Sequence, residues 1–251
     1  MEEREYQAMF TVEAEHWWFI SRRKFVKRLL GAIGVTPHSG KAVRIADIGA
    51  GTGGMIRFLN EYGAVIGVEP NISGRRFAKK RGIVLRNGTA EQTGLVSNTF
   101  DIVCFFDVLY HDGINDELAI GEARRILKPG GLLIITDCAM PYLSGPHDRA
   151  VQGRERYILS RFIKKVERIG FIPLKTSYIF FLLFPLVLMK RLLDRYRPIT
   201  SAAHSDVRPA SAVVNAFCSA VNSLESMGLG YWSYPWGSSL IILARKKGRI
   251  G

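Results

Sequence analysis

Between Val43 and about Ile135, short apolar runs alternate with amphipathic stretches, and this alternation constrains the fold more than any other feature. Five runs bounded by Gly, Asn or Asp are predicted to be buried strands: VRIADIG, AVIGVE, IVLRN, FDIVCFF and GLLIITD. Helices are predicted between them, at GGMIRFLNEYG, SGRRFAKKRG and NDELAIGEARRILKPGG. Strands that alternate with helices pair in parallel through crossovers, so the pattern predicts an α/β fold with helices on both faces of a sheet.

The two ends of the chain continue this pattern with more helix. Residues 1–42 are expected to be helical, and after the five strands we expect further elements in the order helix, strand, basic amphipathic stretch, helix and strand. Their sequences are RERYILSRFIKKVERIG, FIPLKTSYIFF, FPLVLMKRLLDRYR, SAVVNAFCSAVNSLESMG and SSLIILARKK. The two additional strands bring the sheet to seven, and a polar linker is expected around Pro198 to Pro209. Because no repeat or long linker divides the chain, residues 1–251 are predicted to form one domain.

Charge and cysteine content limit the classes of partner and compartment. Lys and Arg number 35 against 22 Asp and Glu, a net charge of +13 that favours nucleic acid, an acidic substrate or a membrane surface. The longest apolar run, Ile179 to Met189, contains Pro185 and is too short for a spanning helix, which needs about 20 residues. Three cysteines without CxxC spacing predict free thiols, no metal site and a reducing compartment. The acidic start MEEREYQAMF is unlike a signal peptide, so we expect a cytoplasmic protein.

A glycine-rich loop is the strongest local signal for a ligand. Asp47 to Gly54, with the sequence DIGAGTGG, follows a predicted strand and opens a predicted helix. Glycines let the backbone approach a ligand closely beside the unpaired amides of a helix N-terminus. Glu69 ends the next predicted strand, where a carboxylate can accept hydrogen bonds from both hydroxyls of a ribose. The loop and the acid together predict a nucleoside ligand.

Two motifs overlap in this loop and favour different ligands. Gly49, Gly51 and Gly54 satisfy GxGxxG, the dinucleotide pattern, whereas Gly49, Gly51 and Gly53 satisfy DxGxGxG. Asp47 favours the second pattern, because its carboxylate suits a cationic amino-acid tail and would repel a pyrophosphate. An NAD-dependent enzyme is the disfavoured alternative.

The DxGxGxG loop and two segments that follow it in family order resemble class I S-adenosylmethionine-dependent methyltransferases of the type 11 kind, over about residues 43–140. These segments are GTAEQTGLVSNTFDIVCFFDVLYH and EARRILKPGGLLIITD, and the C-terminal GSSLIILARKK also resembles the family's final antiparallel strand. HWWF at residues 16–19, followed by an Arg pair, resembles a bacterial small-molecule subgroup. The resemblance implies a Rossmann-like, doubly wound sheet of seven strands, mostly parallel, whose antiparallel final strand lies between strands five and six. It divides the domain into a helical cap (1–42), a cofactor-binding core (43–140) and a substrate-side part (141–251) with a helical insertion at about 182–236.

The resemblance also implies roles for individual residues toward S-adenosylmethionine and its product S-adenosylhomocysteine. Asp47 and the loop residues Gly49, Ala50, Gly51 and Gly53 hold the methionine part, and Glu69 holds the ribose. Around the adenine lie Pro70, Asn71, Thr89, Ala90 and Glu91, while Phe106 faces the sulfonium. The family usually has Asp where Thr89 stands, so adenine recognition departs from the pattern here. From the cap, Trp18 is expected to close the pocket and Arg22 to bind the cofactor carboxylate; packing in the core and a solvated helix face are the alternatives.

Methyl transfer is an in-line displacement, so the protein mainly aligns the nucleophile and removes its proton where needed. Asp107, His111 and His16 are the candidate catalytic residues, with Tyr110 beside them. His111 is the preferred base because an unperturbed histidine has a pKa of about 6.5. The alternative for His111 is a packing or capping role.

The loops after the fourth and fifth predicted strands argue against a nucleobase acceptor. Amino-methylating nucleic-acid enzymes carry (D/N/S)PP(Y/F) after strand four, where this chain has Phe106-Asp107-Val108-Leu109, and no Pro-Cys loop is present. We therefore expect a methyltransferase for a small-molecule or lipid/glycan-precursor acceptor, amphiphilic or anionic. An RNA methyltransferase and a non-catalytic cofactor-binding module are the alternatives, and the chain is expected to be a monomer or homodimer.

One surface expectation concerns residues 184–197. Leu186, Met189, Leu193 and Tyr196 should share a face, with Lys190, Arg191, Arg195 and Arg197 around it. Such a stretch can lie on an anionic bilayer and give peripheral membrane contact, or pack as an internal or dimer-facing helix.

Overall fold

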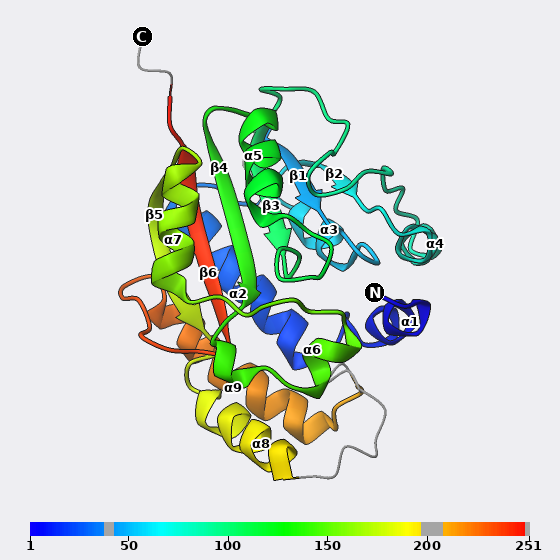
Figure 1. Cartoon of the computed structure of the whole chain (residues 1–251), viewed down its shortest axis with the longest axis vertical. Helices are drawn as coiled ribbons and strands as arrows, with labels where there is room; N and C mark the ends of the chain where they lie inside the picture. Colours follow the sequence, from blue (N-terminus) through cyan, green and yellow to red (C-terminus); the bar gives the residue numbers. More distant parts are fainter. Residues whose placement is uncertain (38–42, 197–207, 249–251) are drawn as a thin grey trace.

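The computed structural model describes residues 1–37, 43–196 and 208–248. Its centre is a six-stranded sheet in the order β2-β1-β3-β4-β6-β5 (Figure 1). The strands are β1 (Arg44–Ile48), β2 (Ala64–Val68), β3 (Phe100–Phe106), β4 (Leu127–Cys138), β5 (Phe171–Ile179) and β6 (Ser239–Lys246). β1 to β4 pair in parallel, and β6 is antiparallel to both its neighbours, β4 and β5. The predicted fold class is confirmed, including the place of the last strand.

One predicted strand is wrong. Residues 83–87 (IVLRN) make only an isolated parallel bridge, between Val68 and Arg86, instead of a seventh strand. The Arg86 amide donates to the Gly67 carbonyl and the Glu69 amide to the Arg86 carbonyl, both at 2.9 Å. In this run Leu85 is buried while Val84 is exposed, so the segment has little apolar surface with which to extend the sheet.

Helices cover both faces of the sheet, as predicted. On one face lie α5 (Asp116–Ile126) and α7 (Leu159–Arg168), and on the other lie α2 (Trp17–Ala32) and α3 (Gly54–Leu59) (Figure 1). Alternate residues of the central strands serve the two layers: in β3, Val103 packs with the α5 side and Ile102 with the α2 side. This alternation explains why the strand sequences are apolar throughout.

The remaining helices surround one end of the sheet. They are α1 (Glu3–Val12), α4 (Ile72–Lys80), α6 (Pro146–Ala150), α8 (Phe184–Tyr196) and α9 (Ala212–Gly228), with a short 3-10 turn at Pro141–Leu143. α1 packs on α4, where the rings of Phe10 and Phe77 lie 5.2 Å apart. α9 packs on α2. Among the described residues, no helix combines the length and apolarity needed to cross a bilayer.

One element boundary differs from the prediction. The helix expected from Arg154 begins only at Leu159, because Gly153 and Tyr157 form bridges with His111 and Ala139. The predicted insertion, about residues 182–236, contains α8 and α9, whereas most of the predicted linker and Arg197 lie outside the described residues, as do the side chains of Arg195 and Tyr196. The division of the domain into cap, core and substrate-side part stays a prediction.

Candidate cofactor and acceptor site

A cavity of about 520 Å³ lies at the carboxyl ends of the parallel strands, the usual ligand position in such sheets. Most of the residues expected from the sequence line it: Asp47, Gly49, Ala50, Gly51, Glu69, Pro70, Asn71, Thr89, Ala90, Glu91, Trp18, Arg22, Phe106, Asp107 and His111. Gly53 and His16 are not among the lining residues. Residues from five separate parts of the chain therefore converge, although their roles toward a ligand stay predictions.

The glycine loop adopts a backbone that other residues would strain. Gly49 and Gly51 have φ values of 74° and 56°, in the left-handed region. A Cβ at Gly49 would lie 2.5 Å from Cγ2 of Val108, and one at Gly51 would lie 2.9 Å from Cε of Met9. Gly53 precedes α3 with φ 80°, and its hypothetical Cβ faces Ile83. Gly53 thus shapes the turn into α3 from outside the cavity.

Glu69 ties the loop to the end of β2. Its Oε2 accepts a hydrogen bond from the Gly51 amide at 2.9 Å, and its Oε1 accepts from the Asn71 amide at 2.9 Å and from the Tyr6 hydroxyl at 3.0 Å. Burial raises the pKa of Glu69 despite these donors, which favour the ionised form. The carboxylate is therefore held in one orientation at the cavity wall.

Asp47 supplies the carboxyl of the glycine loop, and burial perturbs it strongly. Its side chain is only 2% exposed, and Oδ2 has no hydrogen-bond partner among the described residues. Burial raises the pKa of Asp47 from 3.8 to about 7, against the opposing effect of the positive charge of Arg22. A buried carboxylate oxygen without a donor is costly unless a ligand supplies one.

Arg22 and Asp107 form a buried ion pair in the same wall. Nη1 of Arg22 lies 2.5 Å from Oδ2 of Asp107, while Nε of Arg22 and Oδ1 of Asp107 lack partners in the part of the chain that the structure describes. The guanidinium lies against the rings of Trp18, Phe19 and Phe106, at 4.8, 5.3 and 5.7 Å from their centres. Together with Asp47, this wall presents one unpaired donor and two unpaired acceptors.

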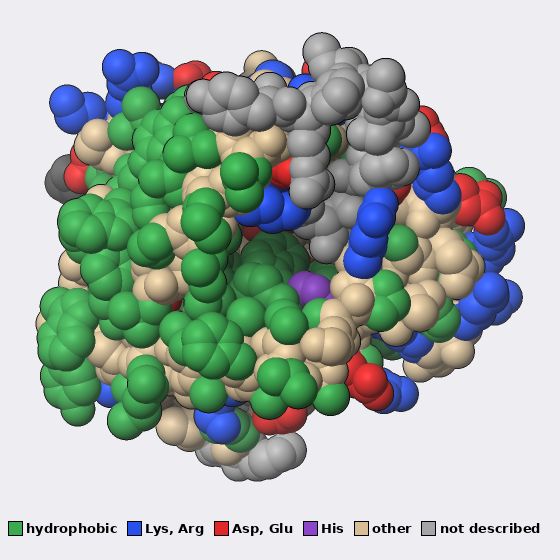
Figure 2. Space-filling model, turned by 90° about the horizontal axis from the view of Figure 1, so that it is seen from below, with side chains coloured by type: hydrophobic (Ala, Val, Ile, Leu, Met, Phe, Trp, Pro, Cys, Tyr) green, Lys and Arg blue, Asp and Glu red, His purple; other side chains and the backbone are tan. Residues whose placement is uncertain are grey.

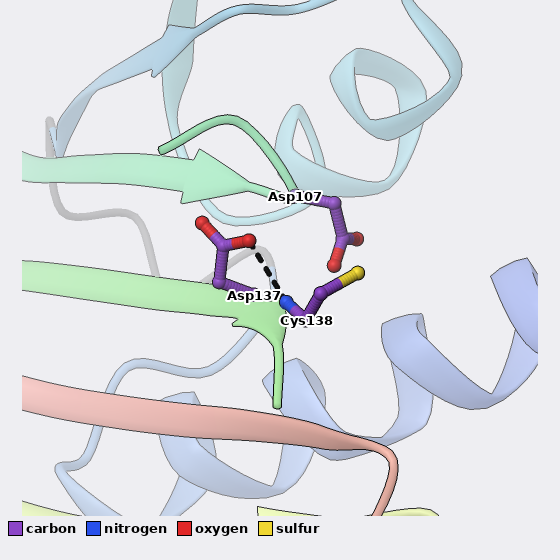
Figure 3. Close-up of side chains that lie close together, drawn as sticks. All are labelled: Asp107, Asp137 and Cys138. Atoms are coloured by element: carbon purple, nitrogen blue, oxygen red, sulfur yellow. Dashed lines mark hydrogen bonds between the residues drawn. The ribbon is translucent and has the colours of Figure 1, made fainter. Parts of the chain in front are cut away.

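Asp137 connects the ends of β3 and β4, beside Asp107 and Cys138 (Figure 3). Asp107 has φ 57°, and its amide donates to the Thr136 carbonyl at 2.8 Å. Asp137 is fully buried and accepts from the Cys138 amide at 2.8 Å and the Leu109 amide at 2.9 Å. Ligand-type atoms of Asp107, Asp137 and Cys138 lie within 4.8 Å of one another. Because both oxygens of Asp137 already accept backbone amides, we interpret it as a clamp that holds the loop carrying Asp107.

His111 lines the cavity near α6, and its backbone bridges to Gly153. Its ring packs 4.3 Å from the ring of Tyr110. Burial lowers the pKa of His111 to about 4, although hydrogen bonds to the backbone of Val151 and Gln152 act in the other direction. The value of about 6.5 expected for an unperturbed histidine is therefore not retained. His147 of α6 also lines the cavity.

The HWWF segment combines packing with lining. His16 caps α2, since its Nδ1 accepts from the Trp18 amide at 3.3 Å, and this position keeps it away from the cavity. Trp17 meets Phe180 edge to face at 5.9 Å, and Trp18 stacks on the same ring at 6.1 Å. Trp18 and Phe19 nevertheless line the cavity. The aromatic residues thus belong both to the core and to the cavity wall.

Sequence reasoning missed the contribution of α1. Glu5, Tyr6, Met9 and Glu13 all line the cavity. Glu13, which directly follows α1, accepts a hydrogen bond from the Thr52 hydroxyl and pairs with Arg81, so the end of α1 is anchored to the glycine loop and to the end of α4. No local pattern in residues 1–15 indicates these contacts, because they join positions far apart in the chain.

Comparisons with known proteins agree with this geometry. Residues 46–135 match the family model described as "Methyltransferase domain". A glycine/sarcosine/dimethylglycine N-methyltransferase of Actinopolyspora halophila is 30% identical over 122 residues, which are 45% of this chain and 21% of that protein. This chain therefore matches less than half the length of the first curated relatives that it resembles, between 21% and 42% of them.

Solved structures share the fold at low identity. An S-adenosylmethionine-dependent methyltransferase of Thermotoga maritima has a TM-score of 0.56 at 21% identity, covering 98% of this chain and 100% of that one. Phosphoethanolamine N-methyltransferase 2 of Haemonchus contortus, in complex with S-adenosylmethionine, has a TM-score of 0.56 at 18% identity. The match covers 89% of this chain and 53% of that one. The methyltransferase family expected from the motifs is confirmed for residues 46–135, and the Haemonchus contortus structure holds S-adenosylmethionine.

Proposed function

We propose that this chain, whose residues 46–135 form a class I S-adenosylmethionine-dependent methyltransferase domain, binds that cofactor in the cavity and methylates a small-molecule acceptor. The observation that carries the proposal is the wall formed by Asp47, Arg22 and Asp107. Its unpaired atoms, two carboxylate oxygens and one guanidinium nitrogen, complement an α-amino acid, which has an ammonium donor and a carboxylate acceptor. The methionine part of the cofactor is such a group.

The rest of the cavity suits the nucleoside part. Glu69 would accept from the ribose hydroxyls, since each carboxylate oxygen can accept more than one hydrogen bond. Pro70, Asn71 and Ala90 line the neighbouring wall, where the adenine would lie. The Thr89 hydroxyl accepts from the Gln92 amide at 3.1 Å, so it supports its own turn as well. This engagement supports our expectation that adenine recognition departs from the family pattern.

Several residues would prepare the acceptor for in-line displacement. When bound, the cofactor supplies an electrophilic methyl group on a sulfonium that leaves as a neutral sulfide. The rings of Trp18 and Phe106 would exclude water from this part of the cavity. His111 is neutral above about pH 4, so it can accept a hydrogen bond or a proton from the acceptor, but burial makes it a weak base. Alignment by the cavity, rather than strong base catalysis, would therefore contribute most.

The acceptor is proposed to be amphiphilic, such as a lipid or glycan precursor. Ile114 and Val151 line the cavity with apolar side chains, while Tyr110, His111 and His147 line it with polar atoms. Two of the similar proteins have names that specify nitrogen acceptors. An uncharged amine would need no strong base before attack, which agrees with the lowered pKa of His111.

Calorimetry and a turnover assay test the proposal. S-adenosylmethionine and its homocysteine product should bind with roughly micromolar affinity, and Glu69→Ala should raise Kd about 10- to 150-fold, the scale of a lost charge-assisted hydrogen-bond site. Glu167→Gln on the exposed face of α7 is the control and should bind like the wild type. Unchanged affinity in Glu69→Ala would contradict the ribose assignment, and tighter binding of NAD would contradict the family's cofactor here. Binding without turnover on any acceptor would identify a non-catalytic cofactor-binding module.

A further inference from the structure

α9 exposes its apolar side chains and buries its polar ones. Its exposed stripe is wholly apolar, with side chains between 56% and 78% exposed at Val213, Phe217, Leu224 and Met227. Its buried side instead carries polar residues, Asn222, Glu225 and Ser226. A helix on a protein surface ordinarily shows the reverse arrangement, so this one is built for contact with an apolar medium or partner.

The polar side of α9 is fixed by specific partners. Nδ2 of Asn222 donates to the Ser21 hydroxyl of α2 at 3.0 Å. The carboxylate of Glu225 accepts from the amides of Phe181 and Leu182 at 3.0 and 3.1 Å, before α8. Rotation of the helix would leave these buried groups unpaired, which is costly. The outward direction of the apolar stripe is therefore determined by the fold.

α8 and the loop after α9 extend the same surface. On α8, Leu186, Met189 and Leu193 are more than half exposed, whereas Arg191 is buried at 7% exposure, close to Gly145. After α9, the aromatic side chains of Tyr231, Trp232 and Trp236 are exposed as well. We call these side chains on α8, α9 and the loop the apolar end surface. Both helices lie at the same end of the molecule (Figure 1), and exposed apolar side chains gathered at one end in this way mark a site of interaction.

The exposed charged side chains of the segments that carry the apolar end surface have one sign. In residues 182–194 and 208–237, the exposed charged side chains are Lys190 and Arg208, while Asp194 is half-buried beside Arg191 and Glu225 is buried. The guanidinium of Arg28 lies 5.4 Å from the ring centre of Tyr231. Apolar residues, interfacial Trp and Tyr, and basic groups are the chemistry of proteins that lie on anionic bilayers.

The cavity is close to this surface. Figure 2 views the end of the molecule that carries α6, α8 and α9, and it shows green side chains around a hollow with a histidine at its wall. The ring of Phe184 in α8 lies 6.4 Å from that of Tyr142, shortly before the cavity-lining α6. A second copy seated over this end would cover the hollow, whereas a bilayer can supply an amphiphilic ligand to it.

We propose that the apolar end surface docks this protein on an anionic lipid bilayer, so that the hollow faces the membrane. Basic residues at its edge provide the attraction to anionic headgroups, and the apolar and aromatic side chains enter the interface. This inference goes beyond the proposed methyl transfer, because docking requires neither cofactor binding nor turnover.

Co-sedimentation with vesicles tests the docking directly. The full chain should bind vesicles of phosphatidylcholine with phosphatidylglycerol, and bind pure phosphatidylcholine at least about tenfold more weakly at low salt. The triple variant Met189→Ser, Phe217→Ser, Leu224→Ser should lose at least about tenfold in partitioning. Val84→Ser with Val96→Ser removes apolar side chains that are 87% and 72% exposed and belong to neither α8, α9 nor the loop after α9, and it should bind like the wild type.

Three results would overturn the proposal: no binding of the wild type to either vesicle, equal binding by the triple variant and the wild type, or equal loss in the control. A concentration-dependent dimer in sedimentation velocity that the triple variant abolishes, without vesicle binding, would assign the surface to a second copy instead. Circular dichroism checks that the variants are folded. Calorimetry with S-adenosylmethionine separates the two proposals, because docking variants should keep the wild-type Kd.

Discussion

Replacing Asp47 by Asn should stabilise the ligand-free protein while it weakens cofactor binding. The pKa of this buried carboxyl rises from 3.8 to about 7 on folding, chiefly through burial. A raised folded pKa means that the folded state binds the proton more tightly, so the contribution of Asp47 to stability is greatest at low pH and is lost as pH rises from 3.8 to about 7. The corresponding penalty is about 4 kcal/mol at pH 8 and about 1.5 kcal/mol at pH 5.

The substitution removes this penalty but introduces a buried amide. An unpaired amide costs about 1–3 kcal/mol, so Asp47→Asn should be more stable than the wild type by about 1–3 kcal/mol at pH 8. The amide does not titrate, and its cost should be nearly the same at both pH values. The difference between variant and wild type should therefore fall by about 2–3 kcal/mol from pH 8 to pH 5.

Urea denaturation of ligand-free protein at pH 5 and pH 8 measures this difference. Glu167→Gln, an exposed carboxyl of α7, is the control and should change stability equally at both pH values. A stability difference for Asp47→Asn that does not vary with pH would refute the reasoning that burial of an unpaired carboxylate strains this site. Weaker binding of S-adenosylmethionine by the more stable variant would show that the strain serves the ligand.

Two further substitutions test contacts that the sequence did not reveal. Tyr6→Phe removes the donor to Glu69 and should lower the free energy of unfolding by about 1 kcal/mol. Tyr231→Phe, at an exposed position, is the control and should leave the free energy of unfolding unchanged. Equal effects of the two substitutions in urea denaturation would argue against an anchoring role for α1. Glu225→Ala leaves two amides without their acceptor and should lower the free energy of unfolding by about 2–4 kcal/mol. Glu225→Gln keeps one acceptor oxygen and should lower it less. Equal decreases in the two variants would mean that the acceptor oxygen is unimportant.

The sequence predicted the sheet and the cofactor end of the site because their signals are local. Each strand that formed carries its own apolar run, and the glycine loop, Glu69 and Asp107 directly follow such runs. Parallel strands place their carboxyl ends at one edge, so residues at those ends converge without further information. The strand prediction for residues 83–87 was wrong, because whether a segment pairs depends on the sheet edge that it meets. The residues of the segment itself do not encode that edge.

Contacts between distant segments could not be predicted in this way. The hydroxyl of Tyr6 reaches Glu69, and Arg22 reaches Asp107, across sequence separations that no periodicity spans. His16 illustrates the converse, because its residue type suggested catalysis while its position before α2 makes it a cap. Burial likewise decides the pKa of His111, and burial is a property of the assembled cavity.

The two helices before the last strand show a further limit of sequence patterns. Periodicity indicates that a helix has an apolar face, but it does not indicate whether that face meets the core or the exterior. In α9 the decision comes from Ser21 and from the amides of Phe181 and Leu182, which give Asn222 and Glu225 better partners inside than water gives them outside. Since those partners belong to α2 and to the turn before α8, the direction of the apolar stripe is set together with the cavity wall that α2 provides. The docking surface and the cofactor site therefore share one structural element, which is how a membrane contact at this end could keep the cavity directed toward an amphiphilic acceptor.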